Sequence, residues 1–276
     1  ADELSDDFIS KIKSRLNQSG EDSILYGEVW EDAPDKVAYN RRRSYLRGSQ
    51  LDSVMNYPLR GAIISYIRYG NCADLRKFTE GTYRRYPKMS SDNLLNFLGT
   101  HDTIRILTSL GGEPEGEHTN AELSVLRMTE TERKTDLTRL KTAYGLIAAM
   151  PGVPCVFYGD EVGMEGYRDP FCRLPFPRSN MDTELLEAYK DLGMLRKNEP
   201  FLADAYFEIN ELTAERFVFK RRAVDGSREL LAVINNTDAA YNLALEEFMT
   251  RNHDRGFLML WRNANANIVG SNQNTA

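Results

Sequence analysis

Four short apolar segments, separated by helical stretches, constrain the fold of this 276-residue chain more than any other feature of its sequence. Each has the length and the flanking turn residues of a buried strand. The segments are Ser23–Gly27, Ser53–Asn56, Leu94–Gly99 and Val153–Tyr158. Apolar residues at helical spacing predict a helix at residues 5–18. Further helices are expected at residues 58–69, 73–85 and 183–197, and at 131–150, where Pro151-Gly152 ends the helix. This alternation of strand and helix predicts a parallel α/β fold.

The pattern changes after Pro200. Alternating apolar and polar residues predict strands at Arg216–Arg221 and Leu230–Ile234, with turns at Asp225-Gly226 and Asn235-Asn236. We therefore expect two domains, an α/β domain over residues 1–199 and a small all-β antiparallel, sandwich-like domain over residues 200–276. The last fourteen residues, NANANIVGSNQNTA, are polar and contain no closing apolar strand, so a truncated second domain is one interpretation.

Two carboxylates, Glu28 and Asp102, come directly after two of the expected strands. Hydrolysis of a glycosidic bond needs such groups, because one must protonate the leaving oxygen while others face a sugar that becomes cationic. A carboxyl group at a strand end is partly shielded from water, which favours the protonated form that a general acid needs. The alternatives are structural: Glu28 could cap a loop or pair with an Arg, and Asp102 could cap the next helix.

Four motifs resemble the alpha-amylase family of glycoside hydrolases, in the family's order and spacing. SILYGEVW (residues 23–30) resembles its strand five, and FLGTHDTIR (residues 97–105) its strand seven. QLDSVMNYPLRGAI (residues 50–63) and MPGVPCVFYGDEVGMEG (residues 150–166) are similar to strands six and eight of its neopullulanase and cyclomaltodextrinase group. The resemblance implies that residues 1–199 are the C-terminal half of a (β/α)8 barrel.

The resemblance also implies roles for individual residues. Glu28 is the expected general acid/base, and Asp102 the expected residue that binds sugar hydroxyls and stabilises the oxocarbenium-like transition state. His101 is expected to hydrogen-bond the same sugar ring, although Thr100 replaces the Asn that commonly precedes the pair.

Three further residues are candidates for the substrate site. Trp30 and Tyr57 are expected to stack on sugar faces, with core packing as the alternative. Arg105 is a candidate to bind substrate or to pair with a carboxylate and hold the site's geometry, with a surface Arg as the alternative. Asp160 and Glu161 are expected to fix the loop after the last strand rather than to react.

A departure from the family occurs at the start. Residues 1–8, ADELSDDF, resemble the acidic helix start that follows the family's Arg-x-Asp motif. The nucleophilic Asp and its Arg are therefore expected upstream of Ala1. We expect the chain to be a fragment that is inactive alone, and that associates with the missing half of the barrel or with itself.

Composition excludes several classes of partner and site. The net charge is −6, from 35 basic and 41 acidic residues, which argues against a nucleic-acid partner. The basic run Arg41-Arg42-Arg43 is expected to be a solvated loop. No apolar run is long enough for a membrane span, so we expect no membrane partner.

The cysteines and acidic residues predict no metal site. Cys72, Cys155 and Cys172 are widely spaced, which argues against zinc and favours a reducing compartment such as the cytoplasm. Cys155 is expected to be buried. No acidic cluster has the spacing of a calcium loop, so we expect no cofactor. A structural calcium in the missing half stays open.

The parent enzyme is therefore expected to hydrolyse α-1,4-glucosidic bonds in an α-glucan oligosaccharide such as maltodextrin, pullulan or a cyclodextrin, with retention. The alternatives are a glucanotransferase with the same residues, or a non-catalytic amylase-like carbohydrate-binding subunit.

Overall fold

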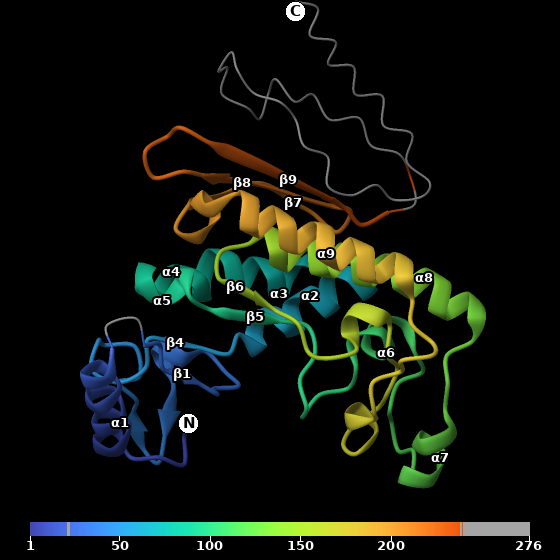
Figure 1. Cartoon of the computed structure of the whole chain (residues 1–276), viewed down its shortest axis with the longest axis horizontal. Helices are drawn as coiled ribbons and strands as arrows, with labels where there is room; N and C mark the ends of the chain where they lie inside the picture. Colours follow the sequence, from blue (N-terminus) through green and yellow to red (C-terminus); the bar gives the residue numbers. More distant parts are fainter. Residues whose placement is uncertain (21–22, 238, 240–276) are drawn as a thin grey trace, which may run out of the picture.

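The computed structural model describes residues 1–20, 23–237 and 239. Four short parallel strands form its centre (Figure 1). β1 (Tyr26–Gly27) pairs with β4 (Ser53–Val54), and β5 (Leu95–Phe97) pairs with β6 (Val153–Cys155). A parallel bridge between Met55 and Leu95 joins the two pairs, so the strands follow the order β1-β4-β5-β6. The predicted parallel α/β arrangement is confirmed.

Helices follow the strands and pack against one another. Among the described elements, α2 contacts α3, α6 and α8, and α8 in turn contacts α9. The α-helices are α1 (Asp6–Ser19), α2 (Tyr57–Tyr69), α3 (Cys72–Arg76), α4 (Tyr83–Arg85), α5 (Lys88–Asp92), α6 (Ile106–Gly111), α7 (Asn120–Val125), α8 (Glu130–Ala149) and α9 (Thr183–Asn198). A π-helical turn, η2 (Lys77–Thr82), joins α3 to α4, and 3-10 turns are η1 (Ala33–Asp35), η3 (Asp160–Val162), η4 (Phe171–Arg173) and η5 (Pro200–Ala203). The predicted helices are confirmed to within a few residues at their ends.

The local sequence explains where the main helices begin. The Asn56 side chain accepts a hydrogen bond from the Leu59 amide at the start of α2, and Gly70 ends that helix in the left-handed region at φ 66°. α8 begins with a capping box, because Thr129 and Glu132 satisfy each other's backbone amides. Its residues Leu140, Leu146 and Ile147 are fully buried.

A three-stranded antiparallel sheet follows the last helix. It consists of β7 (Tyr206–Leu212), β8 (Arg216–Arg222) and β9 (Glu229–Asn235), in that order. Figure 1 shows α8 and α9 between this sheet and the parallel strands. The predicted β8 and β9 are confirmed, and β7 was not predicted. The expected sandwich and the polar C-terminal segment lie largely outside the described residues.

The antiparallel sheet shares its hydrophobic core with the helices. Phe217 on β8 packs edge-on against Tyr66 of α2, with ring centroids 6.5 Å apart. The fully buried Arg221 donates hydrogen bonds to the carbonyl of Ala149 at the end of α8 and to that of Leu202 in η5. These contacts hold the sheet firmly against the α/β part.

Two predictions about single residues were wrong. Arg43 is 6% exposed rather than solvated, because it donates hydrogen bonds to the Asp6 carboxylate and to backbone carbonyls near the start of α1. Arg41 and Arg42 form strand β3, which pairs with β2 (Val37–Ala38) in an exposed hairpin. Cys155 is half-buried rather than buried, because β6 has a strand partner on one side only within the described part of the chain.

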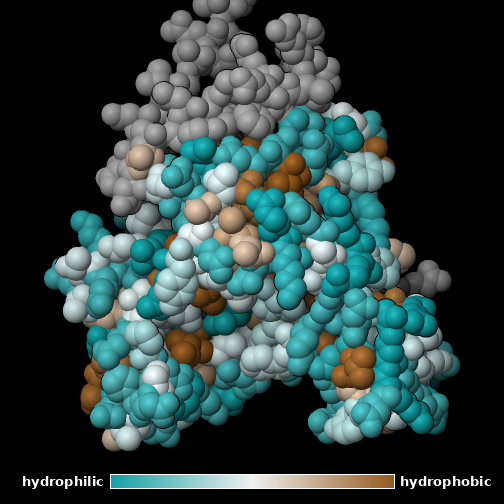
Figure 2. Space-filling model, turned by 180° about the vertical axis from the view of Figure 1, so that it is seen from behind, coloured by the Kyte–Doolittle hydropathy of each residue, from teal (hydrophilic) through white to brown (hydrophobic). Residues whose placement is uncertain are grey.

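The surface is largely hydrophilic, with separate apolar patches, and is hollowed between two lobes at its lower end (Figure 2). The lobes are the α1 region and the α7 region, at opposite ends of the lower edge in Figure 1. Among the described residues, no helix combines the length and apolar character that spanning a membrane requires.

Candidate active site

Glu28 follows β1 directly, and its side chain is held by two aromatic donors. Trp30 Nε1 donates to Glu28 Oε1 at 3.1 Å, and the Tyr57 hydroxyl donates to the same oxygen at 3.0 Å. The carboxyl group is therefore fixed through one oxygen.

Trp30 and Tyr57 also stack on each other, with ring centroids 4.1 Å apart and an interplanar angle of 15°. Trp30 is 48% exposed, so its outer surface can meet a sugar. Tyr57 is 7% exposed, with one face against Trp30 and its ring edge-on to Phe97. Neighbouring rings therefore cover much of Tyr57, and its stacking on substrate stays a prediction.

Tyr57 is a buried phenol under the electrostatic influence of both candidate carboxylates. Burial raises the pKa of Tyr57 to about 12, and the negative charges of Glu28 and Asp102 add to that effect. The hydroxyl is therefore a neutral donor at every physiological pH.

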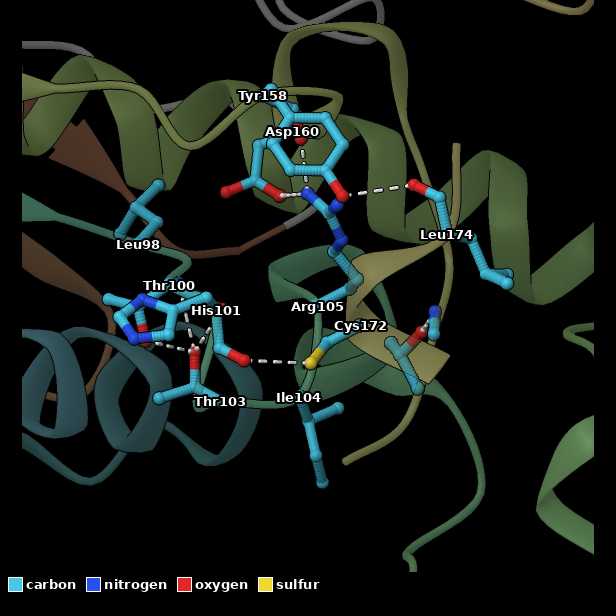
Figure 3. Close-up of polar contacts among 12 residues, drawn as sticks. Leu98, Thr100, His101, Thr103, Ile104, Arg105, Tyr158, Asp160, Cys172 and Leu174 are labelled. Carbon is cyan, nitrogen blue, oxygen red and sulfur yellow. Dashed lines mark hydrogen bonds and ion pairs between the residues drawn. The ribbon is translucent and has the colours of Figure 1, made fainter. Parts of the chain in front are cut away.

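His101 and Asp102 lie in a tight turn after β5. The Thr100 amide donates to Thr103 Oγ1 at 3.0 Å, and the Asp102 amide approaches Thr100 Oγ1 at 3.3 Å, so two Thr hydroxyls define the turn (Figure 3). His101 Nε2 lies 3.2 Å from Asp102 Oδ2. Asp102 does not cap the next helix, because α6 begins at Ile106 without a side-chain cap. That structural alternative is wrong.

Arg173 was missed by sequence reasoning. Its Nη2 donates to Asp102 Oδ1 at 2.8 Å, and its Nε donates to the His101 carbonyl at 2.9 Å. Cys172 Sγ donates to the same carbonyl at 3.1 Å. No spacing signal could have found this contact, because Arg173 ends the short 3-10 turn η4, 71 residues after Asp102.

Arg105 has no exposed surface, and a contact between it and substrate stays a prediction. Its Nη1 lies 3.2 Å from Asp160 Oδ1, in the loop after β6, and also donates to the Tyr158 carbonyl. The alternative in which Arg105 pairs with a carboxylate is therefore the one observed. Asp160 is buried as well, and the Arg105 guanidinium also lies 4.6 Å from the ring centroid of Tyr158.

The described part of the chain contains no group of three or more His, Cys, Asp or Glu side chains that could hold a metal ion. The arrangement at the strand ends is therefore one of hydrogen-bonded carboxylates beside an exposed indole and an imidazole. Such groups can move a proton and can stabilise positive charge.

Comparison with known proteins gives a consistent picture. The family model described as Alpha amylase, catalytic domain, matches residues 4–201. A cyclomaltodextrinase from a Bacillus species is 29% identical over 252 residues, which cover 88% of this chain and 38% of the relative. Neopullulanase 2 from Thermoactinomyces vulgaris is 32% identical over 200 residues, 71% of this chain and 29% of the relative.

A solved structure of cyclic alpha-maltosyl-(1→6)-maltose hydrolase from Arthrobacter globiformis, in complex with maltose, has the same fold. It aligns with a TM-score of 0.65 at 22% identity, over 84% of this chain and 46% of that chain. The chain thus spans less than half the length of each of these proteins.

Proposed function

Because this chain belongs to the alpha-amylase family of glycoside hydrolases, we propose that it supplies two carboxylates of a retaining enzyme that cleaves α-1,4-glucosidic bonds in maltodextrin, pullulan or cyclodextrin. The observation that carries the proposal is the pair of carboxylates after β1 and β5: Glu28 accepts hydrogen bonds from Trp30 and Tyr57, and Asp102 accepts one from Arg173. The cyclomaltodextrinase and neopullulanase names of the relatives support this substrate class.

Glu28 is the proposed general acid/base. Trp30 and Tyr57 both donate to Oε1, so the transferable proton belongs on Oε2. In the first step Oε2 protonates the glycosidic oxygen of the leaving sugar, and in the second the resulting carboxylate deprotonates water. The two donors stabilise the carboxylate between these steps.

Asp102 is the proposed stabiliser of the oxocarbenium-like transition state. One carboxylate oxygen of Asp102 accepts a hydrogen bond from Arg173 and the other faces His101 Nε2, so the carboxylate is fixed before substrate binds. Preorganisation of this kind is effective because the charge need not reorient as the reaction proceeds. His101 is placed to donate to a hydroxyl of the same sugar, and the exposed face of Trp30 is placed to stack on a neighbouring ring.

The nucleophilic carboxylate of the proposed mechanism comes from outside these 276 residues. The four parallel strands correspond to strands five to eight of an eight-stranded barrel, and the outer edges of β1 and β6 have no strand partner in the described part. Apolar side chains are exposed there, Ile24 before β1 and Val153, Val156 and Tyr158 on the other edge. We propose that strands carrying the nucleophile complete the barrel at these edges.

The chain alone is therefore expected to show no turnover of maltooligosaccharide or pullulan. A second polypeptide that supplies strands one to four should restore it when added in trans. Light scattering across a dilution series should show self-association of the chain alone, and its partner should abolish that association. Turnover by the purified chain, or a compact monomer at every concentration, would contradict the half-barrel proposal.

The test of Glu28 uses the completed barrel. Glu28→Gln keeps an oxygen for both aromatic donors but has no proton to give, so kcat on maltooligosaccharides should fall by about 10²–10⁴-fold. A substrate whose leaving group needs no protonation should still form the covalent intermediate. Glu31→Gln is the matched control, because Glu31 is an exposed residue three positions on that pairs with Lys36.

Near-parental hydrolysis by Glu28→Gln would refute the assignment. Products analysed with and without an added acceptor sugar separate hydrolysis from glucanotransfer, because a transferase excludes water and lengthens the acceptor.

A further inference from the structure

A buried ion pair lies behind the proposed site and joins its two loops. Arg105 follows the turn that contains Asp102, and Asp160 begins η3 in the loop after β6. The Arg105 side chain is 0% exposed and that of Asp160 is 3% exposed. Figure 3 shows the guanidinium of Arg105 directed at Asp160 and at the Tyr158 backbone, away from the His101 imidazole.

Asp160 contacts the turn at both ends. Its Oδ1 lies 3.2 Å from Arg105 Nη1, after the turn. Its Oδ2 lies against Gly99, immediately before the turn, where a Cβ would be only 2.2 Å from that oxygen. One buried carboxyl group therefore touches the residues on either side of the segment that holds His101 and Asp102.

Other contacts between the same loops are independent of Asp160. The Arg105 amide donates to the Gly166 carbonyl at 2.9 Å, and the Gly166 amide donates to Thr108 Oγ1 at 3.0 Å. Cys172 and Arg173 hold the His101 carbonyl from the far end of the loop. Loss of the Asp160 carboxyl should therefore shift the turn without releasing it.

We infer that Asp160 is a positioning residue, which acts through Arg105 and Gly99 to set where His101 and Asp102 stand relative to Glu28. The inference rests on the proposed function, because only that function makes the position of His101 and Asp102 matter for catalysis. A displacement of about 1 Å at a reacting group can cost about 10²-fold in rate. Side chains that hold a catalytic group in place can therefore matter as much as contacts to substrate.

The test compares three variants in the completed barrel. Asp160→Ala removes both contacts and should lower kcat by about 10²-fold with KM within about 3-fold of the parent. Asp160→Asn keeps an oxygen for Arg105 and the shape against Gly99, and should recover kcat to within about 10-fold. Glu165→Ala is the matched control, because Glu165 lies in the same loop but pairs with Arg133, away from the turn.

A second readout needs no hydrolysis and uses the completed barrel. Amide NMR signals of His101 and Asp102 should shift in Asp160→Ala and stay in place in Glu165→Ala. If the parent barrel does not hydrolyse α-glucans, the proposed function fails, and the NMR comparison decides the positioning role alone. If Asp160→Ala does not fold, Arg105→Lys replaces it, with the same loss of kcat expected.

Two results would overturn the inference. One is a kcat for Asp160→Ala within about 3-fold of the parent. The other is an equal loss in Glu165→Ala, which would mean that any loosening of the loop has the same effect.

Discussion

Replacing Asp160 by Asn should remove a defined part of the pH dependence of this chain's stability. Burial raises the pKa of Asp160 to about 7 from an ordinary value of 3.8, although the Arg105 and Arg60 guanidinium groups favour its ionised form. The folded chain therefore keeps the Asp160 proton at pH values where the unfolded chain has lost it. Asn cannot ionise, so the variant lacks this linkage.

The sign and size follow from the two pKa values. Protonation of Asp160 adds to the free energy of unfolding. This added stability is fully present below pH 3.8 and is lost as the pH rises through about 7, because the unfolded chain binds fewer protons than the folded chain in that interval. At about 1.4 kcal/mol per pKa unit, the gap corresponds to about 4 kcal/mol. The Asp160→Asn substitution can also change stability by an amount that is the same at every pH, and such a change does not alter how the stability difference varies with pH.

The assay is urea unfolding of the parent and of Asp160→Asn at several pH values from 4 to 8.5. The free energy of unfolding of the parent, minus that of the variant, should fall by about 4 kcal/mol between the two ends. Glu161, which also faces Asp160, is present in both proteins, so the subtraction removes its own titration. Cys155 and Tyr189 ordinarily titrate above pH 8.5, and burial raises their pKa values further, so they do not titrate in this interval. A difference that is constant over the whole range would refute the reasoning.

Three further substitutions test single contacts. Gly99→Ala would place its Cβ 2.2 Å from Asp160 Oδ2 and should lower the free energy of unfolding, measured by thermal unfolding, by about 1–3 kcal/mol. Asp160→Ala in the same chain should remove most of this loss, and destabilisations that simply add in the double mutant would contradict the steric overlap. Tyr57→Phe removes a 3.0 Å hydrogen bond to Glu28 and should lower the free energy of unfolding in urea by about 1 kcal/mol. An unchanged free energy of unfolding would indicate that the Tyr57 hydroxyl bonds water instead of Glu28. Thr129→Ala removes the capping box of α8 and should cost about 1 kcal/mol, checked by calorimetry, where an unchanged Tm would count against the cap.

Most of the α/β framework could be predicted from local sequence. The stop signal Pro151-Gly152 marked the end of α8, and the apolar segment before Glu28 gave the strand that ends at Gly27. Such signals are local, because a helix or strand must repeat its buried face every few residues. β7 was missed although its residues alternate in burial, and α6 was missed because a short, fully buried helix has no amphipathic pattern.

The role of each aromatic residue at the site could not be predicted in the same way. Trp30 and Tyr57 were equivalent candidates for sugar stacking, since residue type alone gives each a flat apolar face. In the structure Trp30 covers Tyr57, so the first remains available to a ligand and the second orients Glu28. Which ring lies outside depends on how β1 and α2 pack, and neither segment contains that information alone.

The sequence by itself determined that Glu28 and Asp102 stand at strand ends of a parallel α/β fold, because strand periodicity and the position of a residue after a strand are short-range properties. Only the tertiary structure decided that Arg173 holds Asp102 and that Arg105 turns inward to Asp160. These contacts join loops that are more than fifty residues apart. The partner of a charged side chain depends on which loops packing brings within a few ångströms, and for Arg105 and Asp160 burial then makes that pairing obligatory.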